Sequence, residues 1–198
     1  MRFIFIMWVA AALTMPVAAQ QIVSEYTDLD QDRHCAVFAG GDSDEGGWAN
    51  LVCQGWRGYP VLIYSADARE SLFYGFPPGG DLAPNWESFN GFNHAGAKIE
   101  WRIAHDGPRA TPFATIHRWF VTVANASQPV EVLVVQKVGQ LHPRAGCVVG
   151  YVVATGNPDA NQKARRIADS KARGYSCGDQ QTIDAGSVTV PAFTRAEN

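Results

Sequence analysis

The clearest secondary-structure signal in the chain is the segment Lys98-Ile99-Glu100-Trp101-Arg102-Ile103-Ala104. Ile, Trp and Ile occupy every second position, and Lys, Glu and Arg stand between them. Such alternation is typical of a strand in an antiparallel sheet that has one face in the core and the other in solvent. The segment therefore predicts a half-buried antiparallel strand.

Similar segments lie on both sides of this strand in the sequence. They are short, contain β-branched and aromatic residues, and are separated by clusters of Gly, Pro, Asn and Asp, which is typical of strands joined by turns. Val132 to Val135 is continuously apolar, as expected of a central strand. These further predicted strands cover residues 34–38, 48–53, 60–65, 71–75, 112–124, 130–138 and 147–154.

One helix is predicted near the C-terminus. Asn157, Pro158 and Asp159 are residues typical of a helix start, and Gly174 is typical of a helix stop. The residues between them form one apolar stripe, which consists of Ala160, Ala164, Ile167, Ala168 and Ala172. Because most of the stripe is alanine, we expect this helix to approach a sheet closely.

These elements predict an α+β fold. Runs of strands followed by one helix favour an antiparallel, β-rich sheet or sandwich-like body of about seven to nine strands with one C-terminal amphipathic helix. Ser187 to Phe193 is expected to add an edge strand. The tail from residue 179 onward has only a weak pattern, which is typical of a loose terminus.

The first 19 residues predict a signal peptide. Arg2 supplies a positive charge, Phe3 to Met15 is almost continuously apolar, and Val17-Ala18-Ala19 provides small residues for cleavage before Gln20. The alternative is a membrane anchor, which needs about 20 apolar residues. Because the apolar segment is shorter and ends at Pro16, we expect residues 20–198 to form a single exported domain, periplasmic or secreted, without stable membrane insertion.

Four cysteines lie after the predicted signal peptide. An even number of cysteines in an exported chain favours disulfides. Four cysteines allow three pairings, and the predicted elements favour Cys35–Cys53 and Cys147–Cys177, because each pair flanks one local unit. A zinc site is not predicted, since the closely spaced cysteine pairs that it requires are missing from the sequence.

The composition excludes several classes of protein. The chain has 198 residues, of which 46% are apolar and 18% charged, with a net charge of −3, so it is neither disordered nor collagen-like. It contains no long run of Lys or Arg, so we do not expect it to bind nucleic acid. Phosphate-binding, dinucleotide-binding and common hydrolase motifs are also missing from the sequence, and no cofactor or metal is predicted.

The segment from Phe76 to Ala97 has no clear period and is too long for an ordinary loop. It carries aromatic residues, which either close one end of the core or form a binding surface. The candidate binding residues in this segment are Trp86, Phe89, Phe92 and His94.

A rival hypothesis is a hydrolytic site without a known motif. Such a site combines His94 or His117 with Glu100 and Arg118. Pairing of the two neighbouring strands would bring Glu100 opposite Arg118, where a surface ion pair is the ordinary alternative. A core position, with a hydrogen-bonded neutral ring, is the ordinary alternative for His117.

Several short motifs together resemble a group of small exported proteins of alphaproteobacteria, of the rhizobial type, whose members carry no assigned activity. The resemblance implies a periplasmic location and a single disulfide-bearing domain, and it transfers no catalytic residue. The motifs are Tyr26-Thr27-Asp28-Leu29-Asp30, Gly58-Tyr59-Pro60-Val61, Ile99-Glu100-Trp101-Arg102, Pro112-Phe113-Ala114-Thr115-Ile116, Cys147-Val148-Val149-Gly150-Tyr151, Asn157-Pro158-Asp159-Ala160-Asn161 and Ala164-Arg165-Arg166-Ile167-Ala168-Asp169.

Export, disulfides and the lack of a catalytic motif favour one function above others. We expect a periplasmic binding or interaction module of the protein-partner or inhibitor type, whose partner is an envelope protein or a small ligand. The alternatives are a periplasmic hydrolase and a structural envelope protein. The sequence thus favours a protein that is not an enzyme.

Overall fold

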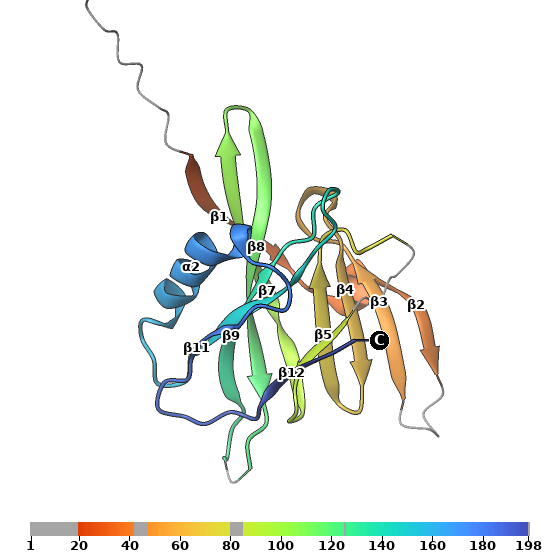
Figure 1. Ribbon diagram of the computed structural model, residues 1–198. Helices are drawn as coiled ribbons and strands as arrows, with labels where there is room; N and C mark the ends of the chain where they lie inside the picture. Colours follow the sequence, from red (N-terminus) through yellow and green to blue (C-terminus); the bar gives the residue numbers. More distant parts are fainter. Residues whose placement is uncertain (1–19, 42–46, 80–84, 125, 198) are drawn as a thin grey trace, which may run out of the picture.

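The computed structural model describes residues 20–41, 47–79, 85–124 and 126–197. The predicted signal peptide lies outside the described residues. Figure 1 shows three layers: a helix, a long central sheet and a second sheet. Both predicted disulfides, Cys35–Cys53 and Cys147–Cys177, are present, and the β-rich α+β fold with one long C-terminal helix is confirmed.

The central sheet has six strands in the order β1-β7-β8-β9-β10-β11. Neighbouring strands are antiparallel except β10 and β11, which are parallel. Their bounds are β1 (Gln21–Asp28), β7 (Asn93–Asp106), β8 (Arg109–Val121), β9 (Val130–Lys137), β10 (Cys147–Val153) and β11 (Thr182–Asp184).

The second layer contains a four-stranded antiparallel sheet in the order β2-β3-β4-β5 and the antiparallel pair β6 and β12. The pair continues this layer beside β5, because Ser71 Oγ accepts from Glu87 N at 2.9 Å and Ser88 Oγ donates to Glu70 O at 2.7 Å. The bounds are β2 (Cys35–Gly41), β3 (Trp48–Cys53), β4 (Val61–Ala66), β5 (Arg69–Tyr74), β6 (Asn85–Phe89) and β12 (Phe193–Glu197).

Within the described ranges the helical elements are few and mostly short. The long one is α2 (Ala160–Lys171), which continues into the 3₁₀ turn η3 (Ala172–Gly174); the others are α1 (Gln31–His34) and η2 (Trp56–Gly58). None of the helices among the described residues is long and apolar enough to cross a membrane. The expected edge strand at 187–193 is displaced, since the strand begins only at Phe193.

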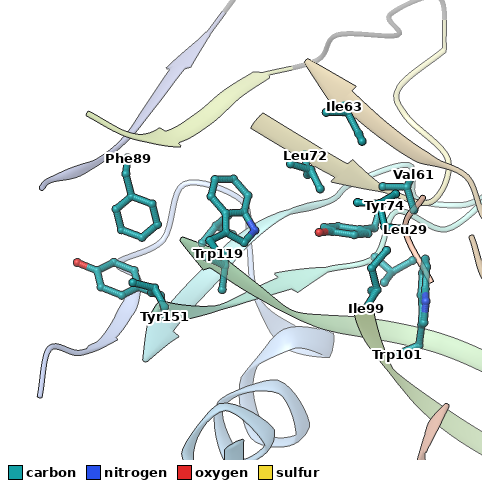
Figure 2. Packing of buried hydrophobic residues seen from close by; sticks show 14 of the residues in the cluster. Leu29, Val61, Ile63, Leu72, Tyr74, Phe89, Ile99, Trp101, Trp119 and Tyr151 are labelled. Atoms are coloured by element: carbon teal, nitrogen blue, oxygen red, sulfur yellow. The ribbon is translucent and has the colours of Figure 1, made fainter. Parts of the chain in front are cut away.

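The main core lies between the two sheets. Figure 2 shows its two ends: Trp119 lies with Phe89 and Tyr151, whereas Trp101 lies near Tyr74 and Ile99. The ring centroids of Phe89 and Tyr151 are 5.3 Å apart, and those of Tyr74 and Trp101 are 5.9 Å apart. These aromatic side chains join the sheets, because each contact links strands of different layers.

The other face of the central sheet packs against α2. Val132 and Val134 of β9 point into the core between the sheets, whereas Leu133 and Val135 belong to the cluster beneath the helix. The predicted central strand is therefore confirmed, and it is continuously apolar because both of its faces are covered. Buried Ala164 and Ala168 allow the close approach of the helix that the alanine stripe predicts.

The prediction that β7 has a solvent-facing polar side is wrong for Glu100 and Arg102. These residues are only 7% and 8% exposed, because they lie under α2. Arg102 donates to both carboxylate oxygens of Asp169 at 2.8 and 2.7 Å, and Arg165 donates to both oxygens of Glu100 at 2.7 and 3.1 Å. Ser24 of β1 links the two pairs, since it donates to Glu100 and accepts from Arg102. We call Ser24, Glu100, Arg102, Arg165 and Asp169 the docking network.

Replacement of Arg102 by methionine tests the docking network. We expect Arg102→Met to lower the free energy of unfolding by about 3 kcal/mol or more, because it leaves the partly buried Asp169 carboxylate without its bidentate partner. Equilibrium unfolding in urea measures the loss. The matched control is Lys98→Met on the same strand, whose ammonium pairs with Asp28 in solvent and should matter little. Equal unfolding midpoints for both variants would contradict this account.

Candidate functional site

The four candidate binding residues do not form one surface. Phe89 is fully buried between Trp119, Tyr151 and Phe193, so its assignment as a binding residue is wrong. The physical reason is the alternation along β6, which directs Phe89 into the core once β6 joins the second layer. The other three residues lie at or near the surface, in two separate hollows.

Trp86 lines a groove on the outer face of the second sheet. The groove has a volume of about 220 Å³ and is lined by Trp48, Asn50, Tyr64, Ser65, Ala66, Asn85 and Trp86. Trp86 also packs against the buried cluster of Leu62, Tyr64 and Phe73. It thus has both a structural contact and an accessible side.

Phe92 and His94 lie in a neighbouring hollow. Phe92 is exposed, and the ring of His94 stacks on Phe120 with centroids 5.1 Å apart. Arg69 and Glu70 also line this hollow, and Glu70 accepts a hydrogen bond from Ala95 N at 2.7 Å. Ser65 lines both the groove and this hollow, so the two adjoin at that residue.

The most exposed apolar surface lies on β2 and β3, which the sequence analysis did not single out. Val37 is 65% exposed and Trp48 45% exposed, and Phe38 and Val52 are also exposed. In the strand register Val37 lies opposite Leu51, whereas Trp48 and Val52 occupy the alternate positions of β3, so these side chains lie on both faces of the sheet edge. We call these four residues the β2–β3 surface. It adjoins the groove, because Trp48 belongs to both.

The edge of the second sheet is uncharged. Among the described residues β2 pairs only with β3, and its sequence, Cys-Ala-Val-Phe-Ala-Gly-Gly, contains no charged residue and no proline. The lack of a side chain at Gly41 leaves room for the Trp48 ring, because a Cβ at this position would lie 2.3 Å from Trp48 Nε1. The sequence alone shows that β2 carries no charged residue. The exposure of Val37 and Phe38 could not be predicted from it, because that exposure depends on the order of the strands in the sheet.

His117 and Glu100 of the rival hydrolytic site do not converge. His117 pairs in register with Ile99 and points into the core, whereas Glu100 lies on the opposite face under α2. The expected pairing of Glu100 with Arg118 is wrong, because the hairpin turns tightly between Asp106 and Arg109 and the register that follows places Glu100 opposite Ile116. Arg118 instead forms an ion pair with Glu131, its neighbour on β9.

His117 is a structural residue of the core. The carbonyl oxygen of Gly96 lies 2.5 Å from Nε2 and must accept, so Nδ1 accepts from the Tyr74 hydroxyl at 2.6 Å. Complete burial disfavours the charged ring and lowers the pKa of His117 to about 4, although the bond to Gly96 acts in the opposite direction. The ring is therefore neutral and unavailable to a substrate.

Glu87 is a second buried titratable group that the sequence analysis missed. Its Oε2 accepts from Val148 N at 2.8 Å, where β10 has a bulge, and its Oε1 lies 3.7 Å from Arg195 Nε. Burial raises the pKa of this carboxyl group, and the hydrogen bond from Val148 partly opposes the shift. These contacts give Glu87 a role in joining the two layers.

Known proteins give no further guide to function. Comparison of the chain with protein-family models, with curated proteins and with solved structures finds no match. Within the described part of the chain, no three His, Cys, Asp or Glu side chains lie close enough together to hold a metal ion. A functional proposal therefore depends on the exposed surfaces and hollows.

The burial of His117 predicts acid sensitivity. In the unfolded chain its pKa returns to about 6.5, so only the unfolded state binds a proton there as the pH falls from about 6.5 toward 4. The contribution of neutral His117 to the free energy of unfolding is therefore complete above about pH 6.5 and is lost progressively as the pH falls toward 4. Between pH 7 and pH 5 we expect a loss of about 2 kcal/mol that His117→Gln does not show. Urea unfolding of both proteins at the two pH values measures it, and equal losses would contradict the prediction.

Proposed function

We propose that the protein is an exported binding module that recognises a protein partner through the β2–β3 surface. The observation that supports this proposal is the exposed, uncharged edge strand β2, where Val37 and Phe38 are in solvent and the neighbouring strand β3 exposes Trp48 and Val52. Edge strands of monomeric proteins ordinarily carry charges, prolines or covering loops that prevent pairing with another chain. Although β2 has a bulge between Val37 and Ala39, it carries no charge and no proline, and an exposed apolar edge of this kind is typical of an interaction site.

The proposed partner binds as an extended segment. A segment that pairs with β2 adds a strand to the second sheet, so that main-chain hydrogen bonds provide affinity and side chains at alternate positions provide specificity. The disulfide Cys35–Cys53 holds the start of β2 against the end of β3, which lowers the entropic cost of ordering the edge on binding.

The groove next to the edge provides a place for a partner side chain. Trp48 and Trp86 both line it, and the guanidinium of Arg69 lies 5.9 Å from the ring centroid of Trp86. Trp, Tyr and Arg are the residue types that dominate binding energy at protein interfaces. The groove thus extends the β2–β3 surface toward the predicted binding residue Trp86.

The two disulfides support a location outside the cytosol. Disulfides form and persist in oxidising compartments, and none of the cysteines is free. In this proposal residues 1–19 are removed, and the domain acts in the periplasm or after secretion.

A peptide library displayed on phage tests the proposed function. Peptides selected on the wild-type protein should bind in extended form and protect the backbone amides of β2 from hydrogen exchange. Val37→Lys should weaken their binding by about tenfold or more, because it places a charge at the centre of the contact. The matched control is Ile183→Lys, which adds the same charge at an exposed apolar residue of edge strand β11. Peptides that bind both variants equally well, or a selection without peptides that depend on β2, would contradict the proposal.

A further inference from the structure

A separate pocket lies on the face of the central sheet that α2 covers, beyond the C-terminal end of the helix. Its volume is about 380 Å³, within the range of small-molecule sites. We call it the basic pocket. It is lined by Gln20, Ala104, Asp106, Arg109, Thr111, Phe113, Lys137, Val138, Gln140, Pro143, Ala145 and Arg173.

The charges in the basic pocket are opposite to those of the whole chain. The protein has 16 Lys and Arg against 19 Asp and Glu, yet this pocket gathers Arg109, Lys137 and Arg173 against the single carboxylate of Asp106. Cations that converge on a concave surface raise the local concentration of anions. The pocket is thus complementary to a negatively charged ligand.

Two of the three cations are held in place before any ligand arrives. The guanidinium of Arg173 lies 4.8 Å from the ring centroid of Phe113 and donates to the side chain of Gln20. Lys137 Nζ donates to the carbonyl oxygen of Tyr175 at 2.7 Å. Fixed cations bind an anion at lower entropic cost than flexible ones. Arg109, in contrast, has no ion pair among the described residues and is available to a ligand.

The remainder of the pocket is largely apolar. Phe113 belongs to the cluster beneath the helix, is only 6% exposed and lies under the guanidinium of Arg173, so it contributes little of the accessible lining. Ala104 and Val138 are also buried, whereas Pro143 and Ala145 provide accessible apolar surface. A simple inorganic anion would leave this surface unused, whereas an anion with an apolar body would bury it.

The second disulfide supports the walls of the pocket. Cys147 of β10 lies opposite Lys137 of β9 in the sheet register, and its partner Cys177 follows η3, which carries Arg173. The bond therefore ties β10, the neighbour of the strand that supplies Lys137, to the segment that follows the turn supplying Arg173.

We propose that the basic pocket binds a small organic anion that combines one acidic group with an apolar body. The acidic group lies among Arg109, Lys137 and Arg173, and the apolar body packs against Pro143, Ala145 and the accessible part of Phe113. This site is separate from the β2–β3 surface and goes beyond the proposed partner recognition, since no residue is shared between them.

Fluorescence titration with two matched probes tests the proposal. The first is 8-anilinonaphthalene-1-sulfonate, and the second is N-phenyl-1-naphthylamine, which has the same aromatic body without the sulfonate. We expect the sulfonate to bind the wild-type protein at least about tenfold more tightly than the neutral probe, and added salt to weaken only the sulfonate. Amide chemical shifts of Thr111, Lys137 and Arg173 should change during the titration.

Charge-matched variants locate the site. The double variant Arg109→Gln with Arg173→Gln should weaken binding of the sulfonate by about tenfold or more and leave the neutral probe unchanged. The control, Arg144→Gln with Arg166→Gln, removes the same charge from two exposed arginines that do not line the pocket, and it should bind like the wild type. Sulfonate binding that survives in the first variant, or falls equally in both, would overturn the proposal. So would shift changes confined to β2 and β3.

Discussion

The burial of Glu100 and Arg102 under α2 is the constraint on which the rest of the structure depends. A charge removed from water costs several kcal/mol unless it is paired and hydrogen-bonded. Glu100 therefore requires Arg165, and Arg102 requires Asp169, and both partners must stand on one face of the same helix. This requirement fixes where α2 lies along the central sheet. Its alanine stripe then packs closely enough to bury Leu133 and Val135. The docking network thus specifies a position, whereas the apolar contacts supply most of the free energy of burial.

The positions of the exposed apolar surfaces follow from this arrangement of the layers. With α2 on one face and the second layer on the other, the central strands of the six-stranded sheet have no broad exposed face. The accessible apolar area lies instead where layers end. At the outer edge of the second sheet, β2 exposes Val37 and Phe38. Beyond the end of α2, the central sheet continues past the helix, and Pro143 and Ala145 line the basic pocket together with three cations. Both candidate sites are therefore consequences of the same layering.

Local patterns in the sequence predict most of the fold. The strand β7, the central strand β9, the helix and both disulfides depend on neighbouring residues or on compact local units, and the structure confirms them. The fate of Glu100 was not predictable in this way, because its partner Arg165 comes from a helix far along the chain. Phe89 was misassigned because its burial depends on β6 joining the second layer, and the open edge at Val37 depends on sheet order. Local periodicity contains none of this information.

Native-state hydrogen exchange of α2 tests the central claim most directly. If the docking network and the alanine stripe make the helix part of the core, backbone amides of Ala164 to Ala168 should exchange only through global unfolding, with the same free energy as the amides of β9. If α2 is instead loosely attached, its amides will exchange through a local opening that costs less than global unfolding by about 2 kcal/mol or more. The first result is the one this arrangement of layers predicts, and the second would contradict it.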